Sequence, residues 1–176
     1  MKFRVRRARE IFQGRVLRLV LRDVDLPNGR RATLQVVEHP GAVAILPVFD
    51  DGDVLLIRQF RPSIGRELYE IPAGTLEPGE RPLATARREI VEETGYRAGR
   101  WQKLAEFYTA PGFCTELMHL FVARDLSPAR APGDADEIIR TARMPLARAL
   151  ELARRGRVRD AKSLVGLLWY AHEQRG

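Results

Sequence analysis

Cysteine and histidine are scarce in this chain of 176 residues, which holds one cysteine, Cys114, and three histidines. A single cysteine cannot form an internal disulfide, which favours a reducing cytoplasm. His39, His119 and His172 lack the spacing of a histidine metal site. Cys114 has no evident activating base nearby in the sequence. We therefore expect neither a disulfide framework nor a histidine or thiol centre.

Long apolar runs are also absent, and no stretch approaches the ~20 residues that a membrane-spanning helix needs. The first residues, MKFRVRRAREIF, are basic but lead into no apolar segment of the kind found in secretion signals. The sequence thus predicts neither membrane insertion nor secretion, and we expect a cytoplasmic protein.

Lysine is rare among the 30 basic residues, which are nearly all arginine. The formal net charge of +7 would favour a polyanionic ligand such as a nucleotide diphosphate, a nucleic acid or an anionic membrane surface. The arginines are scattered, however, and form no compact stripe with interleaved aromatics. We therefore expect no nucleic-acid partner.

The length and the hydrophobic content of 45% suit one domain with a sizeable core. Turn signals divide the chain into expected strands, and two later segments are expected to be helical. The strands cover residues 16–26, 32–38, 43–49, 54–60, 102–108 and 117–123, and the helices residues 145–155 and 160–173. Strands around a central helix with further helices behind them indicate an α+β protein with an α/β/α sandwich.

Residues 74–96, GTLEPGERPLATARREIVEETGY, carry the chemistry. At ~100° per residue, Glu89, Glu92 and Glu93 fall within one arc of a helix, beside an apolar stripe that includes Ile90. Carboxylates so close together repel one another unless a cation lies between them, and hard divalent cations prefer oxygen ligands. This arc therefore predicts a magnesium site. The fixed spacing argues against an ordinary solvated helix face.

That spacing resembles the signature of the Nudix hydrolases: Gly74, Glu80, the run Arg88 to Ile90, the pair Glu92 and Glu93, and Gly95. Tyr96 stands where an aliphatic residue is usual and suits the same packing role. The resemblance implies the Nudix fold, a mixed sheet between helices, for residues 41–176. It leaves residues 1–40 as an N-terminal hairpin region for dimerisation and substrate contacts.

By the same resemblance, the metal ligands are the backbone carbonyl of Ala73 and the carboxylates of Glu89 and Glu93, with Glu92 assisting. The metal is magnesium, with manganese as a substitute. Arg88, being a cation, is expected to hold a glutamate in place. The implied substrate contacts are Arg61 for the diphosphate, and Val16, Leu34 and Gln35 for adenine, with Arg15 beside them.

Catalysis needs a base to activate water unless the metal suffices. The acidic segment Ala131 to Glu137 combines a Pro-Gly pair with three acids and suits a loop that reaches over the site. Glu137 is the preferred base, and Glu116 and Glu92 are the alternatives.

Pro111 lies sixteen residues after Gly95, which resembles the ADP-sugar pyrophosphatase branch, as do the stretches RQFRP, EIPAG and APGFCTE. The resemblance implies cleavage of ADP-ribose to AMP and ribose 5-phosphate by a homodimer whose N-terminal region completes each site. Three alternatives remain: another nucleoside diphosphate sugar such as GDP-mannose, a non-catalytic nucleotide sensor, and a monomer whose hairpin merely covers a sheet edge.

Overall fold

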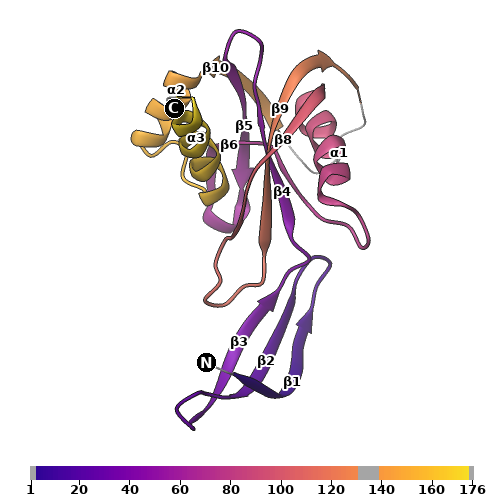
Figure 1. The fold of residues 1–176 in the computed structure, drawn as a ribbon, viewed down its shortest axis with the longest axis vertical. Coiled ribbons are helices and arrows are strands. Elements are labelled where there is room, and N and C mark those ends of the chain that lie inside the picture. Colours follow the sequence, from indigo (N-terminus) through magenta and orange to yellow (C-terminus); the bar gives the residue numbers. More distant parts are fainter. Residues whose placement is uncertain (1–2, 131–138, 175–176) are drawn as a thin grey trace. The chain divides into compact units, whose positions relative to one another are not determined.

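The computed structural model describes residues 3–130 and 139–174. The chain divides into two compact units, each with its own sheet structure (Figure 1). The first unit comprises residues 1–41 and 108–117, and the second comprises residues 42–107 and 118–176.

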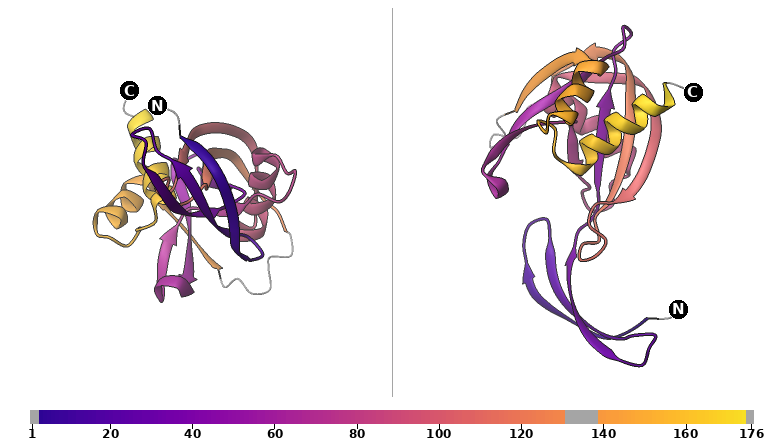
Figure 2. Two further views of the ribbon diagram at one scale, coloured as in Figure 1. Left: turned by 90° about the horizontal axis from the view of Figure 1, so that it is seen from below. Right: turned by 90° about the vertical axis from the view of Figure 1, so that its left-hand side faces the viewer.

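The first unit is built on three antiparallel strands, which Figure 2 shows side by side: β1 (Arg4–Gln13), β2 (Arg18–Asp25) and β3 (Arg31–Glu38). The expected hairpin turn is present between β2 and β3, where Gly29 adopts φ 78°. The sequence prediction missed β1, which pairs with β2 and makes the hairpin a three-stranded sheet. Residues 108–117 join this unit through two backbone hydrogen bonds: the N–H of Val37 donates to the carbonyl of Phe113, and the N–H of Thr115 donates to the carbonyl of Val37.

The second unit contains two sheets with the strand orders β10-β5-β6 and β7-β4-β9-β8. Strands β4 and β9 run parallel, and the other described pairings in this unit are antiparallel. The strands are β4 (Ala42–Pro47), β5 (Asp53–Arg61), β6 (Arg66–Glu70), β7 (Ala73–Thr75), β8 (Tyr96–Tyr108), β9 (Leu117–Pro128) and β10 (Ile139–Pro145).

Helices cover both faces of the sheet that contains β4: α1 (Pro82–Thr94) lies on one face, and α2 (Leu146–Arg154) and α3 (Ala161–Glu173) lie on the other (Figure 1). Successive side chains of a strand point to opposite faces. Accordingly, Val43 and Ile45 pack with Ile90 of α1, whereas Ala44 and Leu46 share a core with α2 and α3. The expected α/β/α layering is therefore confirmed.

The sequence located the strands β2 to β5 and both later helices, with small shifts at their ends. It placed the start of β8 six residues too late, and it missed β6, β7 and β10 and the 3₁₀ turn η1 (Pro62–Ile64). In the described part of the chain, no helix is long and apolar enough to cross a membrane.

Candidate active site on helix α1

Helix α1 begins and ends as its sequence predicts. Gly79 turns the chain with φ 80°, and Pro82 occupies the first helical turn, where its missing N–H costs nothing. The helix ends at Gly95, which adopts φ 72° and donates its N–H to the carbonyl of Val91. Tyr96 packs edge-on against Phe49, with ring centroids 5.4 Å apart, in the apolar role expected of it. The side of the helix that faces the sheet is set by its buried apolar residues, Ala86 and Ile90.

Two of the predicted metal ligands lie against strand β7. Glu93 is 9% exposed, and its carboxylate accepts a hydrogen bond from the backbone N–H of Ala73 at 3.0 Å. Glu89 lies directly over Gly74: a Cβ on that glycine would come within 2.0 Å of its carboxyl carbon. Helix α1 and strand β7 therefore bring Ala73, Glu89 and Glu93 together.

Arg88 binds three glutamates at once. Its Nη1 donates to Glu89 Oε1 at 2.8 Å and to Glu92 Oε2 at 2.9 Å, and its Nη2 donates to Glu80 Oε2 at 3.4 Å. Burial disfavours the charge of Arg88, but these glutamates outweigh it and raise the Arg88 pKa. Burial likewise opposes ionisation of Glu80, yet Arg88 lowers the Glu80 pKa overall. The arginine thus has the contacts needed to orient the carboxylates.

Arg61, at the end of β5, donates from Nε and Nη2 to the two carboxylate oxygens of Glu70, both at 2.8 Å. This hydrogen bonding is the main cause of the raised Arg61 pKa, and the charges of Glu93 and Asp160 add to it. Glu70 also accepts from Lys162. Sequence reasoning named Arg61 but missed Glu70 and Lys162, although Glu70 is the first residue of the EIPAG stretch.

Comparison with known proteins decides the family. The model of the NUDIX domain matches residues 38–165.

This chain belongs to the Nudix family.

Its relatives include an ADP-ribose pyrophosphatase of Bacillus subtilis, which is 45% identical over 88% of this chain and 84% of the relative. A GDP-mannose pyrophosphatase of Salmonella arizonae is 39% identical over 89% of this chain and 87% of its own length. A crystal structure described as an ADP compounds hydrolase superposes with a TM-score of 0.88 at 26% identity, covering 100% of this chain and 96% of the other. The expected Nudix fold and family are therefore confirmed.

Nudix hydrolases generally use a divalent metal ion, and the residues over β7 suit one. Two carboxylates and a backbone carbonyl form an all-oxygen donor set, and Mg²⁺ is often held by one or two carboxylates together with substrate phosphates and water. The described residues contain no group of three or more His, Cys, Asp or Glu side chains at metal-binding separations. The resemblance implies that the backbone carbonyl of Ala73 supplies a third protein ligand.

The other predicted residues are divided between the two units. Glu92 stands beside Arg88 on α1. Glu116 belongs to the first unit, where Thr109 Oγ1 donates to it at 2.5 Å and His39 Nε2 lies 3.8 Å away. Glu137 lies outside the described residues.

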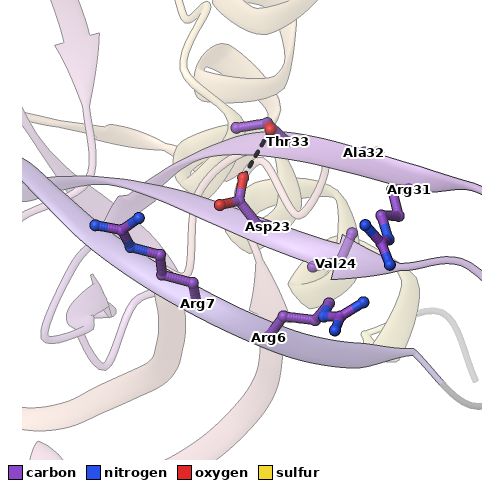
Figure 3. Close-up of a pocket in the computed structure, with 7 residues that line it drawn as sticks. All are labelled: Arg6, Arg7, Asp23, Val24, Arg31, Ala32 and Thr33. Carbon is purple, nitrogen blue, oxygen red and sulfur yellow. Dashed lines mark hydrogen bonds between the residues drawn. The ribbon is translucent and has the colours of Figure 1, made fainter.

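The predicted adenine contacts all belong to the first unit. Arg15 and Val16 are exposed in the turn between β1 and β2, and Leu34 and Gln35 are exposed on β3. As neighbours on a strand, Leu34 and Gln35 point to opposite faces. The same sheet has an open hollow of about 490 Å³, which contains none of the predicted site residues (Figure 3). Its lining is Arg6, Arg7, Asp23, Val24, Arg31, Ala32 and Thr33.

Replacing Gly74 with alanine should abolish most of the enzyme's activity while the protein stays folded. The added methyl would occupy the position of the Glu89 carboxylate and force that flexible side chain aside. We expect turnover to fall by ~10²-fold, the usual order of loss when a catalytic group is misplaced by about 1 Å. Steady-state kinetics and thermal melting measure the two effects. Gly99→Ala on the exposed part of β8 is the matched control and should retain activity, and a fully active Gly74→Ala would contradict the placement of Glu89.

Proposed function

We propose that this chain is a magnesium-dependent pyrophosphohydrolase that cleaves ADP-ribose to AMP and ribose 5-phosphate. The observation that carries the proposal is the 45% identity, across most of both chains, to the ADP-ribose pyrophosphatase of Bacillus subtilis. It agrees with the resemblance of the stretch that ends at Pro111 to the ADP-sugar branch. In the reaction, water adds to one phosphorus, the bridging P–O bond breaks, and the two phosphates leave as separate products.

The residues of the second unit have complementary roles in this proposal. Glu89, Glu93 and the Ala73 carbonyl hold Mg²⁺, with Mn²⁺ as a substitute, while Arg88 orients the glutamates. Once bound, the ion neutralises the charge of the diphosphate and makes its phosphorus more electrophilic. Arg61 binds diphosphate oxygens, for which a planar guanidinium suits better than an ammonium. Glu137 remains the preferred base, with Glu116 and Glu92 as alternatives.

The second candidate substrate is GDP-mannose, because a GDP-mannose pyrophosphatase is 39% identical over most of this chain. A non-catalytic sensor is disfavoured because the motif keeps all of its glutamates and its arginine. We place the enzyme in the cytoplasm, on the basis of its single cysteine.

We further propose a homodimer in which the first unit contributes adenine contacts to the partner's site. All ten residues of β1 are exposed, and they include Ile11 at 51% and Phe12 at 58%. An exposed edge strand with apolar side chains is costly in water and favours association. A second copy of this chain covers such a surface by symmetric pairing.

ADP-ribose should be cleaved with a kcat/KM at least ~10-fold above that for GDP-mannose or any nucleoside triphosphate, a gap of about 1.4 kcal/mol in transition-state binding. A hydrolysis screen across nucleotide sugars, dinucleoside polyphosphates and triphosphates measures this order. Efficient GDP-mannose cleavage with none of ADP-ribose would favour the second candidate. Efficient triphosphate cleavage alone would overturn both.

Activity should require a divalent cation, and Glu93→Gln should reduce kcat by several orders of magnitude. The substitution preserves shape but removes a charge from the ligand set, which a hard cation needs. Turnover is measured with magnesium, with manganese and in excess chelator, and circular dichroism checks the fold. Glu77→Gln, in the loop before α1, is a control that removes a glutamate outside the proposed ligand set. Equal rates of hydrolysis with magnesium and with chelator would contradict the proposed metal site.

Sedimentation of the full chain should show a dimer, and the double variant Ile11→Glu, Phe12→Glu should sediment as a monomer with weaker ADP-ribose binding. Charges on β1 oppose the burial of that strand against a second copy. Leu168→Glu, on an exposed position of α3, is the control and should remain dimeric. A wild-type monomer with full ADP-ribose turnover would refute both the dimer and the shared site.

A further inference from the structure

Arg61 contacts a cluster of oppositely charged side chains that is largely shielded from solvent. Its centre is Glu70, the last residue of β6, which is 1% exposed. Both Glu70 oxygens accept from Arg61, and Oε2 also accepts from Nζ of Lys162. Burial raises the Glu70 pKa, but the two cations lower it overall, so Glu70 is a carboxylate at neutral pH. One buried carboxylate is therefore shared by two cations from different elements.

Lys162 is held on its other side by the start of helix α3. Its side chain is 11% exposed, and Nζ donates to Asp160 Oδ2 at 2.9 Å. Asp160 caps the helix by accepting from the backbone N–H and the hydroxyl of Ser163, at 3.0 and 2.9 Å. The hydroxyl of Ser163 in turn accepts from the N–H of Ile71 at 2.8 Å. The end of β6 and the start of α3 are thus joined by one continuous set of hydrogen bonds.

The position of Lys162 is unfavourable for the helix itself. A cation in the first turn meets the positive end of the helix dipole, and a buried lysine loses both hydration and rotamer freedom. Its two carboxylate partners offset these costs. The charged lysine is therefore stable at this position only because it binds Glu70 and Asp160.

The pairing with Glu70 leaves one end of Arg61 available. Nε and Nη2 donate to Glu70, whereas Nη1 donates no hydrogen bond to any of the described residues, and the side chain is 38% exposed. A guanidinium held along one edge can present its remaining N–H groups to phosphate oxygens in only a narrow range of angles. Any rotation of the Glu70 carboxylate would change that angle.

We propose that Lys162 is a positioning residue for Arg61: by binding Glu70 from the α3 side, it fixes the carboxylate that orients the guanidinium toward the substrate diphosphate. The inference rests on the proposed function, in which Arg61 binds the diphosphate. Lys162 itself contacts no substrate in this account, and its effect passes wholly through Glu70 and Arg61.

The test is a double-mutant cycle of Lys162→Met and Arg61→Gln. Lys162→Met should raise the KM for ADP-ribose about tenfold and leave kcat within about threefold, because loss of a supporting contact weakens binding by this order. Arg61→Gln should raise KM by at least as much. The double variant should match Arg61→Gln alone, since Lys162 has nothing left to position. The proposal is wrong if the fold-increase in KM of the double variant equals the product of the two single increases. It is also wrong if Lys162→Met leaves KM unchanged.

Matched variants separate positioning from folding. Lys103→Met removes an exposed lysine that pairs with Glu106 and should leave KM unchanged. Lys162→Arg keeps the charge and both carboxylate partners within reach, and should restore much of the affinity. If Lys162→Met does not fold, Asp160→Asn keeps a good helix cap while weakening the hold on Lys162, and it should show the same KM increase and the same loss of effect beside Arg61→Gln.

The double-mutant cycle also tests the role of Lys162 independently of which nucleotide sugar is the substrate. If wild type cleaves GDP-mannose and not ADP-ribose, the proposed substrate is wrong, and the cycle is run on GDP-mannose because the diphosphate is common to both. If it cleaves neither, the cycle is run on the Kd of ADP-ribose measured by calorimetry. If the losses of binding free energy from the two single substitutions add in the double variant, in any of these assays, the role of Lys162 is contradicted.

Discussion

The close approach of helix α1 to strand β7 is the constraint on which the proposed site depends. Glu89 occupies the space that a side chain at residue 74 would fill, and Glu93 accepts the N–H of Ala73. Beside these glutamates, the helix buries Ala86 and Ile90 against the same sheet, of which β7 is the edge strand. Apolar burial sets the distance between helix and strand, and the glycine allows it to be short enough to bring the carboxylates of Glu89 and Glu93 against the backbone of β7.

Electrostatics explains why so many charges can be assembled in this unit. Arg88 neutralises part of the charge of Glu80, Glu89 and Glu92. Glu89 and Glu92 lie on the same helix as Arg88, and Glu80 lies in the loop before that helix. A second arginine, Arg61, is paired with a buried carboxylate instead of being left alone. Buried or half-buried ions are tolerated when their partners complete the hydrogen bonding. The unit therefore holds cations and anions in fixed positions, which suits a diphosphate that binds together with a metal ion.

Sequence reasoning succeeded where local chemistry decides structure. The hairpin turn at Gly29 and the helix end at Gly95 both adopt a positive φ, and the apolar stripe of α1 faces the sheet as its periodicity requires. It failed for β1, because five of the ten residues in RVRRAREIFQ are charged and none is buried. A strand held by pairing alone leaves no burial pattern to detect. Strands β6 and β7 were missed for a related reason: they are short, at five and three residues.

The sequence by itself determined the family, the helix that carries the glutamates and the residues that suit a metal, because these depend on fixed spacing along one continuous segment. Only the tertiary structure decided which distant residues meet that segment. Glu70 and Lys162 are 92 residues apart. No sequence pattern near either residue indicates that they pair. Their contact exists because β6 ends where α3 begins, and long-range packing of that kind leaves no periodic or local signal in the chain.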